Sequence, residues 1–408
     1  MKSIIPFLKR LFPPPLHDRV VLVGGTVRDM WLGRESQDID LVTSVSHDEL
    51  CALGFRLVSA TSGVTIYFMH HPGFGKVEVT RINNMAGIEN DLLRRDFTIN
   101  AMAMTLHSDH IDPLDGRKDL ESGILRVCSN HTFRDDPLRI FRAFRFETDG
   151  WVMSSETTAL IRADEWGDAF ISMPIERFSG ELLKALTHKS PELFFQRMIE
   201  FNAGVEFLPE LFQMPQVPAG PLQHHPEGDL FSHSTQVLQL VTAASSDPLA
   251  RFCALFHDLG KLATDHAHYP RHFGHEYAGF AMATAVCSRL CLPTKYRTAL
   301  AWVCRLHGKA NLWNELRDSS KLKMAEQALK SGIVEILPFV SAADKAGGLP
   351  MADWKDVVKV AGMSARMLVI DQEKLEAMQI VKRSSFILQK RVDVLKALRV
   401  TNYCETSV

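Results

Sequence analysis

One short stretch, residues 19–42, constrains the fold of this chain more than any other. It begins with an apolar, β-branched run, which predicts a buried strand, and this run stops at Gly24 and Gly25. A short helical segment follows. The stretch then ends in an alternating segment, a second predicted strand, in which Asp38 and Asp40 point to the same face. Two strands and a helix packed into so few residues predict an α/β domain near the N-terminal end.

The same stretch carries the residue types of a phosphate and metal site. Two carboxylates a few ångströms apart repel each other unless a cation lies between them, and Mg²⁺ prefers such oxygen ligands. Gly24 and Gly25 allow a phosphate to approach the backbone, and Arg28 adds a forked donor. Each motif alone is more often a plain turn or a solvated strand end. Their order and spacing favour a nucleoside-triphosphate site with two metal ions.

Length and composition limit the class of protein. At 408 residues the chain exceeds one ordinary core, so we expect two to four units. The formal charge of -2 excludes a uniformly basic nucleic-acid binder, so any RNA site must be a local patch. Seven scattered cysteines without a C-x-x-C pair indicate reduced thiols, and no apolar run approaches the ~20 residues of a membrane span. We expect a cytoplasmic protein with no membrane partner.

The first domain is predicted to cover residues 1–130. Its basic, apolar start, residues 1–18, is expected to be an arm or short helix packed on this domain. Residues 63–82 predict a β-hairpin, because two β-branched or aromatic runs flank a turn. Glu78 lies in the second run, and strand pairing would bring it beside the two aspartates as a third carboxylate. A plain exposed glutamate is the alternative.

A second polar group follows the hairpin. Arg94, Arg95, Asp96 and Asn100 stand among small and apolar residues, which favours a binding role over a solvated charge run.

From about residue 131 the pattern becomes helical, and residues 131–220 are predicted to form an all-α domain. Its first helix carries arginines among phenylalanines, including Arg142. Asp136 and Arg139 are three residues apart, so their side chains share a face. An intrahelical ion pair is the alternative to a binding role.

Histidines mark a third predicted domain, residues 221–350, which a helical tail at 351–408 follows. Imidazoles and carboxylates on facing helices are a means by which helical domains hold divalent ions. A lone buried histidine is usually a satisfied core residue, but a set of this size favours a metal site. Its members are His224, His225, His233, His257, Asp258, His272, His275, His307 and Asp344.

Five motifs in this order resemble the bacterial class II tRNA nucleotidyltransferase and poly(A) polymerase family. They are LVGGTVRD, Asp38-x-Asp40, LLRRDFTINAMAM, IDPLDGRKDL and RDDPLRIFRAFRF. The later FSHSTQVL, FCALFHDLGK and RHFGHEYAG are similar to the HD domain of CCA-adding members. The resemblance covers roughly residues 19–345. It implies an α+β palm of the polymerase-beta type, an all-α neck and body, and an α-helical HD domain.

The resemblance also implies an activity and a set of site residues. The enzyme would add C and A to the tRNA 3′ end from CTP and ATP, without a nucleic-acid template. Asp38 and Asp40, with Glu78 as a third catalytic carboxylate, would hold two Mg²⁺ ions. The residues expected to bind the nucleotide are Gly24, Gly25, Arg28, Arg94, Arg95, Asp96, Asn100, Asp136, Arg139 and Arg142.

Asp136 and Arg139 match the amino-acid template that selects the base in this family. Cytosine and adenine both present an amino donor beside a ring-nitrogen acceptor, which a carboxylate and a guanidinium complement. Uracil and guanine present a carbonyl and an N–H there, so acceptor would face acceptor. Asp135 replaces the usual glutamate and leaves this pair intact.

A departure from the family lies at residues 82–93, where CCA-adding relatives carry a longer flexible loop. A loop this short suggests an enzyme that adds only the two cytidines and leaves the adenosine to a partner enzyme. Two further alternatives are a poly(A) polymerase and, from another class, a metal-dependent HD phosphohydrolase that acts on RNA ends. The sequence leaves a monomer and a homodimer equally open.

For the HD domain the resemblance implies a divalent metal of unknown identity. The likeliest ligands are His233, His257, Asp258 and Asp344, with His275 and His307 as additional candidates. In relatives a carboxylate commonly follows the histidine at position 307, whereas here Gly308 follows. Hydrolysis of phosphomonoesters or 2′,3′-cyclic phosphates and a retained scaffold are therefore both open.

Overall fold

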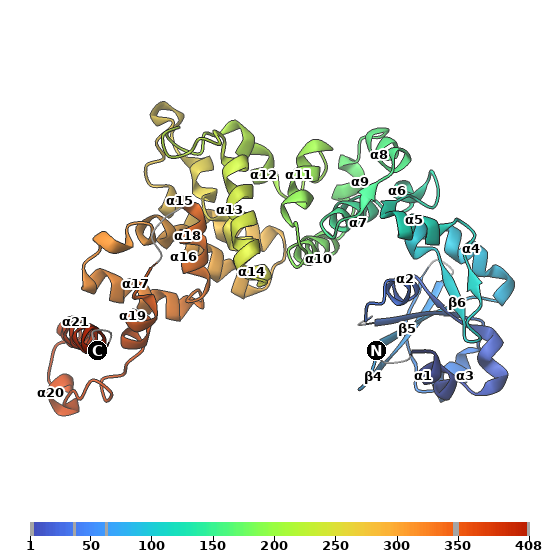
Figure 1. The fold of residues 1–408 in the computed structure, drawn as a ribbon, viewed down its shortest axis with the longest axis horizontal. Helices are drawn as coiled ribbons and strands as arrows, with labels where there is room; N and C mark the ends of the chain where they lie inside the picture. The colour runs from blue at the N-terminus through green and yellow to red at the C-terminus, as the bar shows by residue number, and fades with distance from the viewer. Residues whose placement is uncertain (1–3, 36–37, 62–63, 346–350, 406–408) are drawn as a thin grey trace. The chain divides into compact units, whose positions relative to one another are not determined.

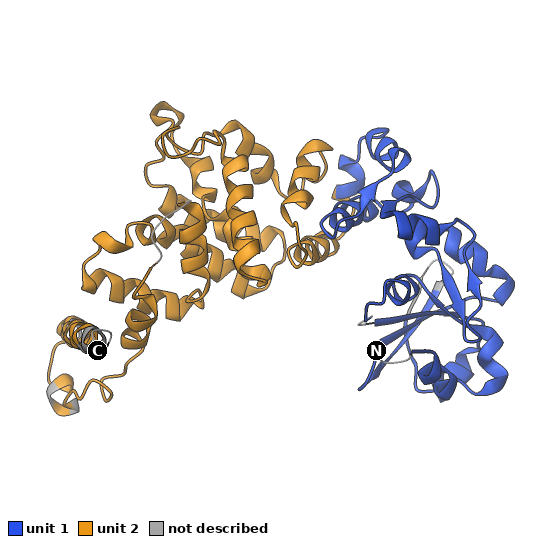
Figure 2. Ribbon diagram, in the orientation of Figure 1, with its two compact units in different colours: residues 1–170 blue, residues 171–408 orange. Residues whose placement is uncertain are grey.

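The computed structural model describes residues 4–35, 38–61, 64–345 and 351–405 (Figure 1). The chain divides into two compact units, residues 1–170 and 171–408 (Figure 2). The expected α+β first part is confirmed, and the remainder is mostly helical, with the short strand β9 (Val152–Met153) as an exception to the all-α prediction. The finer division at residues 130, 220 and 350 stays a prediction.

A mixed sheet of seven strands, in the order β3-β4-β5-β2-β1-β6-β7, forms the centre of unit 1. The apolar run of β1 is buried at every position, as its sequence predicts. The predicted hairpin is confirmed as the antiparallel pair β4 and β5. The strands are β1 (Val20–Val23), β2 (Asp38–Thr43), β3 (Arg56–Thr61), β4 (Val64–His71), β5 (Gly75–Arg81), β6 (Ala103–Thr105) and β7 (His110–Ile111).

Short helices pack around this sheet and continue beyond it. Ser46 caps α3 with a capping box, which explains why the helix begins there. Ile88 and Leu92 of α4 pack into the cluster of β1 and β2 side chains. The helices are α1 (Ile4–Leu11), α2 (Gly25–Trp31), α3 (His47–Ala52), α4 (Ile88–Leu93), α5 (Gly116–Ser122), α6 (Thr132–Asp135), α7 (Leu138–Glu147), α8 (Ser155–Arg162) and α9 (Gly167–Ile171).

Three short 3₁₀ helices and a second small sheet complete unit 1. The 3₁₀ helices are η1 (Pro14–Arg19), η2 (Met85–Gly87) and η3 (Thr98–Asn100). The small sheet pairs β8 (Ile124–Leu125) with β9 (Val152–Met153) in parallel.

All regular elements among the described residues of unit 2 are helices. Four of its helices, α13 (Leu230–Ala244), α14 (Pro248–Phe256), α16 (Thr294–Ala310) and α18 (Ile336–Asp344), pack against one another. Among the described residues no helix combines the length and apolarity that a membrane span needs.

The helices of unit 2 are α10 (Ile175–Ala185), α11 (Glu192–Glu200), α12 (Pro209–Gln213), α13 (Leu230–Ala244), α14 (Pro248–Phe256), α15 (His275–Arg289), α16 (Thr294–Ala310), α17 (Asp318–Ser331), α18 (Ile336–Asp344), α19 (Trp354–Ala361), α20 (Gln372–Glu376) and α21 (Ile380–Glu405). The 3₁₀ helices are η4 (Met214–Gln216), η5 (Leu259–Ala263), η6 (His266–His268) and η7 (Trp313–Glu315).

Candidate active site and metal centre

Strand register brings three carboxylates to one end of the sheet in unit 1. β2 and β5 pair in parallel, with Asp40 directly beside Glu78 and Asp38 beside Lys76. Side chains of paired residues on neighbouring strands lie on the same face of a sheet. Glu78 is therefore next to the aspartate pair, the arrangement that the sequence left open.

The carboxylates repel one another, and this repulsion affects the pKa of Asp40. Burial, followed by the charge of Glu78, raises the pKa of Asp40 above its ordinary value. Arg95 and Lys76 act in the opposite direction and offset only part of this effect. Lys76 Nζ donates to Glu78 Oε2 at 2.5 Å. A cluster of acidic oxygens with this much repulsion fits a hard divalent cation.

The diglycine turn is shaped by close contacts. Gly24 has a φ of +66°, and a Cβ there would lie 2.6 Å from Nη1 of Arg95. The next helix, α2, begins at Gly25, and its second residue is Thr26, a buried residue that the sequence analysis missed. The N–H of Asp40 donates to Thr26 Oγ1 at 2.9 Å, and this hydroxyl donates to the carbonyl of Asp38 at 3.3 Å. Thr26 thereby fixes the aspartate strand to the turn.

Asp91 is a second residue that the sequence analysis missed. Its buried carboxylate accepts hydrogen bonds from both predicted phosphate-binding arginines. The Arg94 Nη2 donor lies at 2.5 Å, and the Arg95 Nη2 donor lies at 2.9 Å. Asp91 lies three residues before Arg94 and four before Arg95, so all three share a helical face. This spacing was the available signal in the sequence.

A chain of hydrogen bonds joins four of the predicted nucleotide-binding residues. Arg28 Nη1 donates to Asn100 Oδ1 at 2.6 Å, and Asn100 Nδ2 donates to Asp96 Oδ1 at 3.0 Å. Arg142 Nε donates to the other oxygen of Asp96 at 2.7 Å. The chain connects α2, η3 and α7.

Asp96 is the buried centre of this chain. Burial alone would raise its pKa, but the Arg142 guanidinium, the Asn100 amide and the N–H of Phe97 hold the pKa of Asp96 well below its usual range. Asp96 is thus an ionised residue that ties the helix of Arg142 to the sheet domain.

Arg139 lies beside Arg94 and Arg95. Its guanidinium donates to the carbonyl of Arg94 at 2.8 Å and to that of Arg95 at 3.5 Å. Asp136 lies just before α7, where its carboxylate accepts the N–H of Leu138 at 3.3 Å. Their predicted role in base selection stays a prediction.

Segment 82–93 is folded and packed. It consists largely of η2 and α4, and Ile88 and Leu92 are buried. Between it and the end of β5 lies a polar cavity of about 490 Å³, whose lining includes Arg81 and Arg94.

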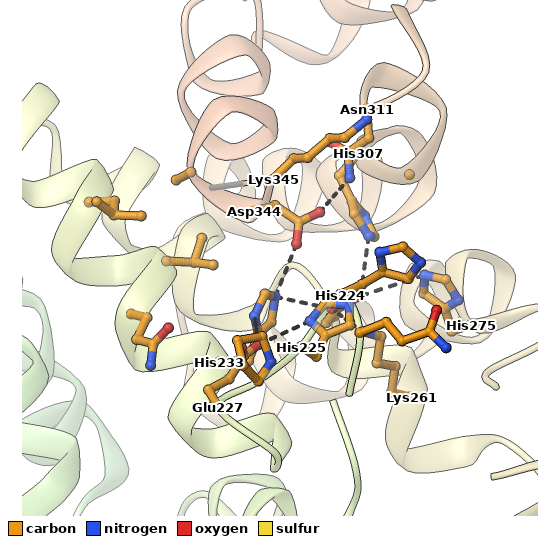
Figure 3. A pocket seen from close by; sticks show the side chains of 18 residues that line it. His224, His225, Glu227, His233, Lys261, His275, His307, Asn311, Asp344 and Lys345 are labelled. Carbon is orange, nitrogen blue, oxygen red and sulfur yellow. Dashed lines mark hydrogen bonds and ion pairs between the residues drawn. The ribbon is translucent and has the colours of Figure 1, made fainter. Parts of the chain in front are cut away.

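In unit 2 the first four predicted ligands, His233, His257, Asp258 and Asp344, come together. Figure 3 labels two of them, His233 and Asp344. His233 Nε2 lies 3.0 Å from Asp344 Oδ1, and His257 Nε2 lies 3.3 Å from the same oxygen. His257 Nε2 is also 3.3 Å from Asp258 Oδ2. Helices α13 and α18 and the junction between α14 and η5 supply these side chains, so all but the neighbours His257 and Asp258 lie far apart in the sequence.

The two additional candidates, His275 and His307, approach the second carboxylate oxygen of Asp258. Asp258 Oδ1 lies 3.2 Å from His307 Nε2 and 3.5 Å from His275 Nε2. Imidazole nitrogens and carboxylate oxygens in such groups can hold a divalent metal. The cluster opens into a cavity of about 610 Å³.

Charge is balanced at this cluster. Burial would lower the pKa of His257, but Asp258 and Asp344 raise it to about 10. Burial would raise the pKa of both acids, yet both lie well below the usual range, because Lys261 and His257 stabilise ionised Asp258 and His257 stabilises ionised Asp344. Protonated His257 therefore supplies positive charge to the two aspartates, as a bound metal ion would.

Three residues around the cluster were missed. Lys261 Nζ lies 2.6 Å from Asp258 Oδ2, and Asn311 Nδ2 donates to Asp344 Oδ2 at 2.6 Å. Glu227 accepts hydrogen bonds from two of the histidines. For Lys261 the spacing of three residues from the aspartate was a usable signal; the other two depend on tertiary contacts.

Two histidines of the original set play other parts. His272 is buried and bonds to the Thr264 hydroxyl and the Pro218 carbonyl, so it is a core residue. His224 is exposed and lines the cavity (Figure 3).

Family models match both sites. Residues 20–126 match the poly A polymerase head domain, and residues 230–337 match the HD domain. The multifunctional CCA protein of Alkalilimnicola ehrlichii is 37% identical over 361 residues, covering 82% of this chain and 86% of that protein. The protein of the same name from Methylococcus capsulatus is 34% identical, covering 88% and 90%.

Solved structures share the fold. The Thermotoga maritima CCA-adding enzyme complexed with tRNA aligns with a TM-score of 0.62 at 20% identity, over 97% of this chain and 92% of that one. The Bacillus stearothermophilus CCA-adding enzyme in complex with CTP also gives 0.62 at 20% identity, over 98% and 93%. At this identity the likeness establishes the fold alone.

Proposed function

This chain belongs to the class II CCA-adding nucleotidyltransferases that carry an HD domain, and we propose that its acidic cluster is where CTP and ATP react with the tRNA 3′ end. The observation that carries this proposal is the strand register that sets Glu78 beside Asp40 and next to Asp38. The relatives are named for CCA addition, and the CC-only, poly(A) and HD-only alternatives are not favoured.

We assign to the cluster two Mg²⁺ ions, which would activate the RNA 3′-hydroxyl and neutralise the triphosphate. The residues of the chain do the positioning. The backbone at Gly24 admits the triphosphate closely, and Arg28 and Arg95 contribute positive charge beside it. Asp91 holds Arg95 in place.

We assign base selection to Asp136 and Arg139. The carboxylate accepts from the amino group of cytosine or adenine, and the guanidinium donates to the adjacent ring nitrogen. Arg139 would have to exchange one of its present carbonyl contacts for the base. A cytoplasmic location stays a prediction, and so does the choice between monomer and homodimer.

The experiment is incorporation of labelled CTP into tRNA that lacks its 3′ end. Asp40→Ala should abolish incorporation, because the metal site loses its half-buried carboxylate. Asp18→Ala is the matched control, since this aspartate of the same unit is 89% exposed. Incorporation by Asp40→Ala at the wild-type rate would remove the proposal.

A second function is favoured by the open histidine cluster. We propose that the HD site binds a divalent metal through His233, His257, Asp258 and Asp344 and hydrolyses phosphomonoesters or 2′,3′-cyclic phosphates. The buried donor set beside a cavity of about 610 Å³ supports it. The test is hydrolysis of 2′,3′-cyclic AMP and p-nitrophenyl phosphate with Mn²⁺, Co²⁺ and Ni²⁺ in turn. No hydrolysis with any of these ions would remove this function.

A further inference from the structure

Glu227 holds two histidines with one carboxylate oxygen. Its Oε1 lies 2.7 Å from Nδ1 of His233 and 3.0 Å from Nδ1 of His225 (Figure 3). The Glu227 side chain is only 8% exposed. A carboxylate accepts and cannot donate when it is ionised, so each imidazole donates from Nδ1.

These bonds determine what the other ring nitrogen of His233 can do. With Nδ1 donating to Glu227, the neutral ring has a lone pair on Nε2. This nitrogen lies 3.0 Å from Asp344 Oδ1 and 3.7 Å from Asp258 Oδ2. It is thus directed into the ligand cluster. A carboxylate behind a metal-binding histidine fixes the ring and increases its basicity.

His225 is held by the same oxygen but takes a different place. Its ring lies edge-on to that of His233, with 4.8 Å between centroids, and it lines the cavity. The ring rests on Gly220, where a Cβ would come within 2.4 Å of His225 Cδ2 and 3.0 Å of Nε2. Any side chain at position 220 would displace His225. His233, in contrast, contributes none of the atoms nearest to that Cβ.

We propose that Glu227 is a positioning residue for two tasks: it orients His233 to bind the divalent ion, and it orients His225 to contact the phosphoester substrate. Gly220 provides the space for the second task alone. The assignment to His225 rests on the hydrolase function proposed above. The assignment to His233 concerns metal binding and can be tested without any hydrolysis.

The test uses the full-length protein and Co²⁺, with excess Mg²⁺ present so that the carboxylate site of unit 1 stays filled. Visible absorption of bound Co²⁺ reports imidazole ligation. Glu227→Ala should weaken Co²⁺ binding by about 10–100-fold, the usual effect of losing such a partner. Glu227→Gln should recover most of this affinity, because its amide oxygen can still accept from both rings.

Gly220→Ala and His225→Ala separate the two tasks. Both should bind Co²⁺ as the wild type does, while kcat/KM for 2′,3′-cyclic AMP falls by about 10–100-fold. CTP incorporation and thermal unfolding are the controls in every variant, because neither should change if unit 1 and the fold are intact.

Wild-type Co²⁺ affinity in Glu227→Ala would overturn the role of Glu227. Equal loss of Co²⁺ binding in Gly220→Ala and Glu227→Ala would overturn the division into two tasks. A wild-type protein that binds Co²⁺ but hydrolyses no phosphoester would remove the hydrolase function and the task of His225. In that case the Co²⁺ titration still decides whether Glu227 orients His233.

Discussion

The two acidic sites of this molecule have opposite charge balance. In unit 1, Asp40 has a raised pKa, because burial and neighbouring Glu78 oppose its charge. In unit 2, Asp258 and Asp344 have lowered pKa values, because imidazole and ammonium groups surround them. Both sites fit a divalent ion, but only the first is short of positive charge without one.

This difference predicts how each site would respond to a metal ion. At the carboxylates of unit 1 an arriving cation relieves repulsion that is already present. At the histidine cluster a cation must replace a proton on His257, whose pKa is about 10. Strand register builds the first site, and hydrogen-bonded histidines on separate helices build the second.

The largest effect is expected when one acid is removed from each site. Asp40→Ala should reduce nucleotide incorporation by at least about 10⁴-fold, because metal stabilisation is worth several kcal/mol. Asp344→Ala should abolish phosphoester hydrolysis with Co²⁺ and leave incorporation unchanged. Both assays are run on both proteins. Loss of both activities in either variant would show that the sites are not independent.

Asp96 offers a third case, a buried acid with a fixed guanidinium partner. Asp96→Ala should lower the free energy of unfolding of unit 1 by ~3–5 kcal/mol, because it removes the buried carboxylate that accepts from Arg142, Asn100 and the N–H of Phe97. Asp18→Ala should change little. Since the pKa of Asp96 is held low, its contribution is present at neutral pH and is lost as pH falls below the ordinary aspartate value of about 3.9. Urea unfolding of both proteins at neutral pH and at a pH below this aspartate value checks this. An unchanged midpoint for Asp96→Ala at neutral pH contradicts it.

Metal binding at the histidine cluster should be coupled to proton release. Co²⁺ binding at the histidine cluster should release about one proton near neutral pH, because His257 must deprotonate. Affinity should then fall about tenfold for each pH unit below neutrality. Calorimetry in buffers of different ionisation enthalpy measures the release, with Asp344→Ala as the site control. Binding without proton release would mean that His257 is neutral in the ion-free protein.

How far the sequence alone could reach differs between the sites. The strand of Asp38 and Asp40 follows from alternation, and the hairpin follows from its turn and β-branched arms. The position of Glu78 could not be derived, because register depends on which strand lies beside β2, and β5 is distant in sequence.

The histidine cluster could be predicted as a set but not as a geometry. The number of histidines indicated a metal site, yet His272 is a core residue and Glu227 was overlooked. Glu227 has no periodic or spacing signal, since its importance arises from contacts with two rings. Asp91, by comparison, could have been found from its spacing to Arg94 and Arg95.

A smaller effect is expected on stability at the carboxylate site. Asp40→Asn should raise the unfolding midpoint of the metal-free protein by roughly 2 °C, because a repelled charge is removed. The sign follows from linkage: a raised acid pKa means that the folded state binds the proton more tightly, so metal-free stability increases as pH falls through that pKa. Mg²⁺ should stabilise the wild type and not the variant. A lower midpoint for Asp40→Asn would contradict the account of repulsion.

The most direct test of the central claim is the sequence of the product. Full-length enzyme is incubated with Mg²⁺ and a tRNA that lacks its last three nucleotides, with CTP alone, ATP alone, or both. With both nucleotides the account predicts a tRNA that ends in CCA, and with Asp38→Ala an unextended one. A product that stops at CC, a long adenosine tail, or full extension by Asp38→Ala would contradict it.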